Sequence, residues 1–97
     1  MIGYEGNKNV VSSRVREARI RLNLSQGEVA AQLQVLGINI DQQMLSRIEH
    51  NLRLVTDFEL VGLAYVLKVS VYWLLSGYAW EDSIQRGLDS FQEVREE

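Results

Sequence analysis

Residues 25–51 read "SQGEVAAQLQVLGINIDQQMLSRIEHN" and contain the signals for two consecutive helices. Ser25, followed three positions later by Glu28, is a capping box, in which each side chain accepts a hydrogen bond from the backbone N–H of the other. Asp41 is a second N-cap, because its carboxylate can accept from the free N–H groups of a first turn. Gly37 tolerates the left-handed conformation that ends helices. The stretch therefore predicts two capped helices joined by a short connection.

The second of these helices, expected over 41–51, has a distinctive outward face. Leu45 and Ile48 fall three positions apart and form its apolar stripe. The other side chains project outward and comprise two amides, a hydroxyl and a guanidinium. Such a face is suited to recognition of another molecule through hydrogen bonds. These outward side chains belong to Gln42, Gln43, Ser46 and Arg47.

Helical spacing continues on both sides of this stretch, and the chain contains no proline. A first helix is expected over 10–22, with Asn23 as its stop. A second capping box, Thr56 with Glu59, opens a fourth helix, and Ser70 can cap a fifth. The expected apolar faces are Val11, Val15, Ala18 and Leu22; Val29, Leu33 and Leu36; and Leu60, Leu63, Ala64 and Leu67. The pattern predicts an all-α fold, an orthogonal bundle of five short helices.

The composition excludes several classes of protein. The 97 residues suffice for one small domain, and 46% apolar residues exclude wholesale disorder. The chain has no cysteine, which excludes disulfides and thiolate metal sites, and a lone histidine makes no metal site. No cofactor is expected. The apolar runs are too short to span a membrane, and the first ten residues lack a secretory signal, so we expect a soluble cytoplasmic protein.

The net charge of −3 is unevenly distributed. Residues 1–80 carry 8 Lys+Arg and 7 Asp+Glu, whereas residues 81–97 carry 2 and 6. Six of the eight basic residues in the first part lie between positions 8 and 47. Overall acidity is therefore compatible with a local basic face, although it argues against non-specific coating of phosphate.

Three stretches, in this order, resemble the lambdoid phage repressors and Cro proteins, the XRE-like helix-turn-helix family. They are "SSRVREARIRLNLSQGEVA" at 12–30, "LSRIEHN" at 45–51 and "LAYVLKVSVYWLLSG" at 63–77. The resemblance covers residues 9–77 and implies a five-helix lambda-repressor-like DNA-binding bundle. Residues 1–8 would form an N-terminal arm, and residues 78–97 an acidic amphipathic C-terminal helix.

The resemblance also implies which residues contact DNA. Members of the family place the second helix of the motif in the major groove, with the residues at its start against bases. A glutamine amide matches N6 and N7 of adenine, and an arginine guanidinium matches O6 and N7 of guanine. Base contacts are expected from Gln42, Gln43, Ser46 and Arg47. Phosphate contacts are expected from Gln26, His50, Asn51, Arg53, Lys8 and Arg14.

Some of these assignments have alternatives. The two glutamines could simply be solvated, Ser46 could reach a base or a phosphate, and Arg47 could make phosphate or intramolecular contacts instead. Close relatives also pair an arginine of the first helix with a glutamate late in the recognition helix. Arg19 and Glu49 occupy those positions, so we expect a structural ion pair between them.

The chain departs from the family pattern at three places. The connection between the two motif helices is longer than usual, and we expect Ile38 and Ile40 to pack onto the core there. Lys68 stands where the family commonly has glycine after the fourth helix, which implies mild backbone strain. Asp57 replaces a basic residue that some relatives have. The longer connection can tilt the recognition helix and so alter which bases it reads.

The resemblance implies a sequence-specific transcriptional regulator, a repressor of phage or mobile-element type, that binds a palindromic operator in double-stranded DNA as a homodimer. It is not expected to be an enzyme. The alternative is an antitoxin or a protein-interaction module, which could use the C-terminal segment to bind a partner. The apolar stripe of that segment either dimerises or folds back on its own domain; it consists of Trp80, Ile84, Leu88, Phe91 and Val94.

Overall fold

The computed structural model describes residues 6–76 of the chain. Within that range the chain forms five helices and no strand: α1 (Ser12–Arg21), α2 (Gln26–Val35), α3 (Gln42–Glu49), α4 (Asp57–Leu67) and α5 (Val71–Ser76). The predicted all-α fold is confirmed, and the observed helices are up to two residues shorter at each end than expected. The C-terminal helix expected over 78–97 lies outside the described residues.

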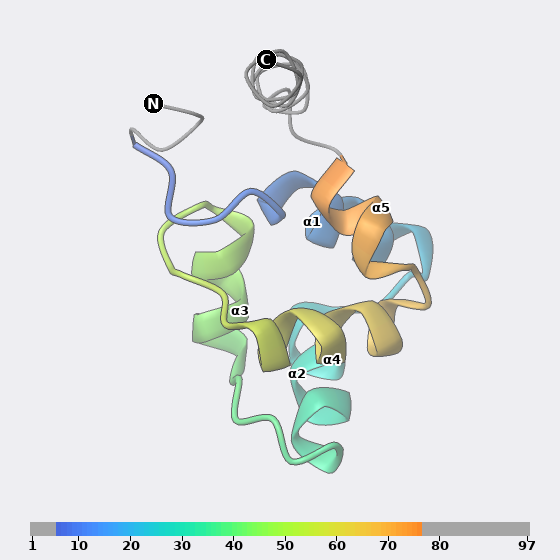
Figure 1. Ribbon diagram of the computed structural model, residues 1–97. Coiled ribbons are helices and arrows are strands. Elements are labelled where there is room, and N and C mark those ends of the chain that lie inside the picture. Colours follow the sequence, from blue (N-terminus) through green and yellow to red (C-terminus); the bar gives the residue numbers. More distant parts are fainter. Residues whose placement is uncertain (1–5, 77–97) are drawn as a thin grey trace, which may run out of the picture.

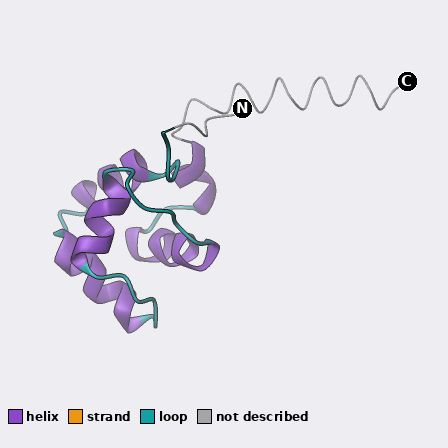
Figure 2. Ribbon diagram, turned by 90° about the vertical axis from the view of Figure 1, so that its left-hand side faces the viewer, coloured by secondary structure: helices purple, strands orange, loops and turns teal. Residues whose placement is uncertain are grey.

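The helices cross one another around a single core (Figures 1 and 2). Helix α2 packs against α3 and α4, while α1 packs against α3, α4 and α5. Figure 1 shows α3 at one edge of the bundle and α5 on the other side of the core. As a consequence, one side of α3 is covered by its neighbours and the opposite side faces outward.

Polar side chains begin the helices as the sequence predicts. In the first capping box, Ser25 Oγ accepts from the Glu28 N–H at 3.0 Å, and Glu28 Oε1 accepts from the Ser25 N–H at 2.8 Å. These bonds favour the ionised carboxylate and lower the pKa of Glu28. Asp41 Oδ1 accepts from the Met44 N–H at 2.8 Å at the start of α3. The capping box that begins α4 and the Ser70 cap of α5 are also present.

Four helices end at a residue in the left-handed conformation, where two backbone bonds close the last turn. At the end of α2, the Ile38 N–H donates to the Leu33 carbonyl and the Gly37 N–H to the Gln34 carbonyl, at 3.0 and 2.9 Å. This is the Schellman arrangement, which satisfies carbonyls that the helix leaves unpaired. The left-handed residues are Asn23, Gly37, Asn51 and Lys68, with φ between 59° and 81°. Lys68 has the strained backbone expected of it.

The core consists of the apolar faces of all five helices. Its fully buried larger side chains are Val15, Val29, Leu33, Ile40, Leu45, Ile48, Leu63, Leu67 and Leu74. Ile40 and the partly buried Ile38 anchor the connection between α2 and α3, as predicted. The prediction for Leu36 was wrong, because this side chain is 44% exposed. Helix α2 ends at Val35, so the next residue no longer follows the helical spacing.

Candidate DNA-binding site

The outward face of α3 carries the polar side chains that the sequence singled out. Leu45 and Ile48 are fully buried on the inner side of the helix. Gln42, Gln43 and Arg47 are exposed, whereas Ser46 is half-buried. Asp41 holds the first turn, so the two glutamines project from a fixed helix start rather than from a loop.

The start of α2 lies beside the start of α3. A Cβ atom built on Gly27 would lie 3.6 Å from Oε1 of Gln42, an ordinary van der Waals contact. The first turn of α2 also presents unpaired backbone N–H groups, which favour an anion such as phosphate. One surface therefore combines two exposed amides with a helix N-terminus.

Glu49 joins the helices that form this surface. Its carboxylate accepts from Nε and Nη2 of Arg19 in α1 at 2.7 and 3.0 Å, and from Nε2 of Gln26 in α2 at 3.1 Å. The Glu49 side chain is 1% exposed and that of Arg19 is 14% exposed. Hydrogen bonding to Glu49 raises the pKa of the Arg19 guanidinium. The expected ion pair is thus present and fixes α3 to both preceding helices.

The comparison with protein families identifies this arrangement. A model of a helix-turn-helix family (HTH_3) matches residues 15–74. The chain belongs to the XRE-type helix-turn-helix family. It is a DNA-binding regulator of transcription, in a family that is generally non-enzymatic. A comparison with curated proteins gave no match.

In helix-turn-helix terms, α2 is the first helix of the motif and α3 is the recognition helix. Residues 36–41 connect them. The structure brings Gln42, Gln43 and Arg47 together on the exposed side of the recognition helix. Gln26 lies at the start of α2 and donates one amide N–H to Glu49, which leaves the second N–H of the same nitrogen for another acceptor. Contacts of these side chains with DNA stay predictions.

His50 follows the recognition helix and is exposed. Its Nδ1 lies 2.7 Å from the carbonyl oxygen of Ser46. A carbonyl only accepts, so Nδ1 donates and the neutral ring presents Nε2 as an acceptor. Only the imidazolium form of His50 could therefore donate Nε2–H to a phosphate.

Two of the predicted phosphate residues have other partners in the structure. Arg53 makes two parallel bonds of 2.9 Å to the Glu59 carboxylate, which raise the pKa of Arg53 and lower that of Glu59. Arg14 lies over the Trp73 ring, 4.3 Å from its centroid, on the side of α1 that faces α5. A phosphate would have to compete with these partners for either arginine.

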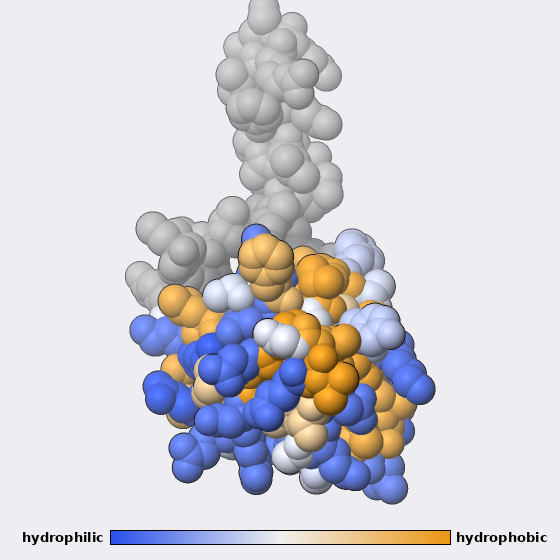
Figure 3. All heavy atoms as spheres, turned by 90° about the horizontal axis from the view of Figure 1, so that it is seen from below, coloured by the Kyte–Doolittle hydropathy of each residue, from blue (hydrophilic) through white to orange (hydrophobic). Residues whose placement is uncertain are grey.

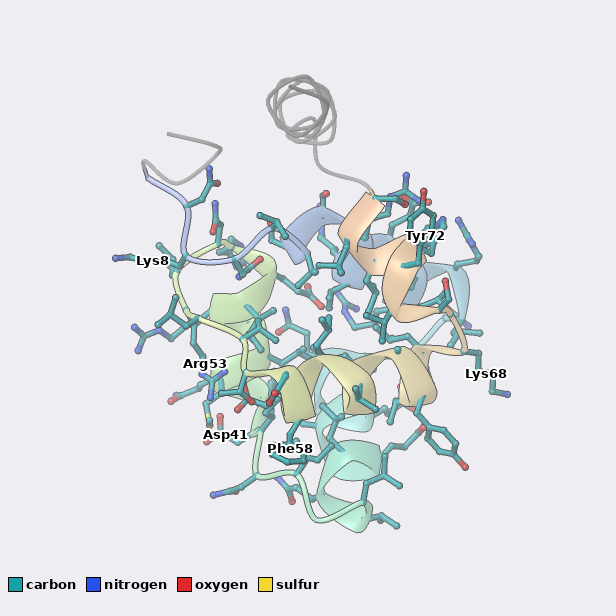
Figure 4. All side chains as sticks on the ribbon, viewed as in Figure 1. Lys8, Asp41, Arg53, Phe58, Lys68 and Tyr72 are labelled. Carbon is teal, nitrogen blue, oxygen red and sulfur yellow. The ribbon has the colours of Figure 1, made fainter. Side chains whose placement is uncertain are left out.

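Asn51 also forms hydrogen bonds within the protein. Its side chain binds the segment that precedes α1, accepting from the backbone N–H groups of Lys8 and Asn9. The side chain of Lys8 itself is exposed and points outward on the side of α3, along which Arg53 and Asp41 also lie (Figure 4). The sequence predicts for Asn51 only a phosphate contact, and it predicts no role for Asn9.

Residues 6–76 contain neither a candidate metal site nor a candidate membrane-spanning helix. No group of three or more His, Cys, Asp or Glu side chains in this part of the chain could hold a metal ion. None of the helices described there is long and apolar enough to cross a membrane.

Proposed function

We propose that this regulator is a repressor of the phage or mobile-element type and reads bases with the start of α3. The observation that carries the proposal is that α3 has one buried apolar side and one exposed polar side. Its inner side is fully buried through Leu45 and Ile48, and its outer side exposes Gln42 and Gln43 at a capped start. Gln42 and Gln43 would each pair with an adenine in the major groove, and Arg47 with a guanine.

The bracing of α3 supports this role. A base-reading side chain needs a helix whose orientation is fixed relative to the parts that contact the backbone. Glu49 provides this by bonding both Arg19 of α1 and Gln26 of α2. Gln26, at the N-terminus of α2, would contact a phosphate while it holds the recognition helix in register.

We further propose that the repressor acts as a homodimer on a palindromic operator. Two recognition helices would then enter successive major grooves about 34 Å apart. An exposed apolar groove of about 460 Å³ between the α2–α3 connection and α4 supports a protein partner, since contiguous apolar surface of this kind marks interaction sites. Occupation of a promoter by the dimer would block transcription.

The base-reading role is tested with the double variant Gln42→Ala, Gln43→Ala. The operator is first selected from random duplex DNA with the wild-type protein. We expect the double variant to bind it at least about thirtyfold more weakly, because each lost amide pair costs about 1–3 kcal/mol. Affinity for unrelated DNA should stay unchanged, since that affinity comes from phosphate contacts and falls with rising salt.

Gln32→Ala is the matched control, because it removes an exposed amide from α2 rather than from α3. It should leave operator binding intact. A double variant that still discriminates its operator from unrelated DNA would contradict the assignment. A wild-type protein that selects no sequence would instead favour the antitoxin or protein-interaction alternative.

A further inference from the structure

The end of the recognition helix is bound to the segment that precedes α1. Asn51 ends α3 with φ of 59°. Its Oδ1 accepts from the Lys8 N–H at 2.7 Å and from the Asn9 N–H at 3.0 Å. Its Nδ2 donates to Oδ1 of Asn7 at 2.6 Å. One side-chain amide thus contacts three consecutive residues that lie more than 40 positions away in the sequence.

Asn9 makes the reciprocal attachment. Its Nδ2 donates to the carbonyl oxygen of Ile48 at 3.1 Å and to that of Arg53 at 2.9 Å, on either side of the turn that Asn51 makes. Its Oδ1 accepts from the Val11 N–H at 3.0 Å, just before α1. The Ile48 carbonyl belongs to the last turn of α3 and also accepts from the Asn51 N–H at 3.1 Å. The segment is therefore held through both its backbone and its side chains.

Glycine would satisfy the backbone of position 51, since it adopts positive φ at no steric cost. The side chain of Asn51 must then serve something else, and the hydrogen bonds of its amide go to residues 7–9. Lys8 lies in the middle of this segment with its backbone fixed and its ammonium pointing outward on the α3 side (Figure 4). The exposed His50 adjoins Asn51 on the same helix end.

We infer that Asn51 is a positioning residue that fixes residues 7–9 against the recognition helix, so that Lys8 binds a backbone phosphate at the edge of the groove that α3 enters. This inference rests on the DNA binding proposed above. Ordering the segment on folding means that no entropy of ordering is lost when DNA binds, which makes the Lys8 contact more favourable than one from a free arm. The contact would also fix how far α3 sits along the groove.

The test combines Asn51→Gly with Lys8→Ala. Asn51→Gly keeps the left-handed backbone and removes the amide. Operator affinity is measured against salt concentration for wild type, both single variants and the double variant. Lys8→Ala should make the slope of log K against log[salt] shallower by about 0.9, as expected for one lost phosphate contact. Asn51→Gly should make the slope shallower as well. In the Asn51→Gly background, Lys8→Ala should change the slope by less than half as much as it does in wild type.

Asn23→Gly is the matched control. Asn23 ends α1 with the same φ of 59°, so this variant makes the identical substitution in the identical conformation away from the N-terminal segment. The effect of Lys8→Ala should be the same in the Asn23→Gly background as in wild type. An equal effect of Lys8→Ala in the wild-type and Asn51→Gly backgrounds would overturn the inference.

Amide hydrogen exchange of the free protein gives a reading that does not need DNA. The N–H groups of Lys8 and Asn9 donate to Asn51, so their exchange should speed up at least tenfold in Asn51→Gly and not in Asn23→Gly. Unchanged exchange would show that Asn51 does not hold the segment. If exchange responds but the wild-type protein binds no operator, the proposed function fails while the attachment of the segment stands.

Discussion

At the scale of single residues, Glu49 joins the recognition helix to α1 and α2. It is charged and almost fully buried, and its carboxylate accepts three hydrogen bonds from two other helices. Arg19→Met should therefore destabilise the fold by about 3–5 kcal/mol, because it leaves a buried carboxylate without its cation. Urea unfolding followed by circular dichroism measures this loss.

The control removes both charges. Arg19→Met combined with Glu49→Leu replaces the ion pair with apolar groups of similar size, which is often close to neutral for a buried pair. The double variant should therefore be more stable than Arg19→Met alone. A double variant whose loss equals the sum of the two single losses would show that the pair has no coupling and that each residue acts independently.

At the scale of helices and connections, Gly62 allows the α2–α3 connection to pack. Gly62 is buried in the middle of α4, and a Cβ atom there would overlap Cδ1 of Ile38 and touch Leu33. Alanine normally stabilises a helix interior by about 1 kcal/mol relative to glycine. Here we expect Gly62→Ala to destabilise the domain instead, by about 1–3 kcal/mol, as overpacking of a core does. Thermal unfolding measures the difference.

Ile38→Val provides the matching background, because it removes the Cδ1 methyl that a new Cβ would meet. In this background the cost of Gly62→Ala should fall by about 1 kcal/mol or more, the range of coupling measured between residues in contact. An equal cost in both backgrounds would mean that the glycine is required for a reason other than its contact with Ile38.

The starts and ends of the helices were predictable because they depend on nearby residues. Ser25 bonds Glu28, Asp41 bonds Met44, and Asn23 closes the last turn of its own helix. Such contacts span only a few positions, so the sequence alone displays them. Within the site, the outward face of α3 was predictable from the spacing of Leu45 and Ile48. The Arg19–Glu49 pair was predictable for another reason, because it follows from the family resemblance.

The remaining contacts join residues that are distant in the sequence, so they could be identified only from the folded structure. Asn9 meets the Arg53 carbonyl across 44 positions, and Ile38 meets Gly62 across a helix boundary. The partner of Arg53 is closer in sequence, at Glu59, but that carboxylate already had a complete role as the capping residue of α4. Local patterns could not show that one side chain serves two partners.

At the scale of the whole molecule, the polar recognition face and the apolar groove are separate surfaces. The groove is lined by Leu36, Ile38, Phe58, Val61, Gly62 and Tyr65. Seen from that side, apolar side chains gather into a patch next to a polar region (Figure 3). On α4, Phe58 is 81% exposed, Val61 60% and Tyr65 73%. The palindromic operator proposed above would require a second copy of the chain, and this patch would offer the two copies a surface on which to meet.

The prediction for the whole molecule is that the protein is a dimer with about twice the 11.1 kDa mass of one chain and that Tyr65→Glu dissociates it. A carboxylate at the groove would lose its hydration in the interface without gaining a partner.

Tyr72→Glu is the matched control, because Tyr72 is equally exposed, at 73%, and lies on α5 away from Phe58 (Figure 4). Sedimentation equilibrium measures the mass. A dimer that survives Tyr65→Glu but dissociates on Tyr72→Glu would move the interface to α5, and one that dissociates only on deletion of residues 80–97 would assign it to the C-terminal segment. Whichever variant is monomeric should also lose operator affinity as protein concentration falls, because one recognition helix reads only half of the palindrome.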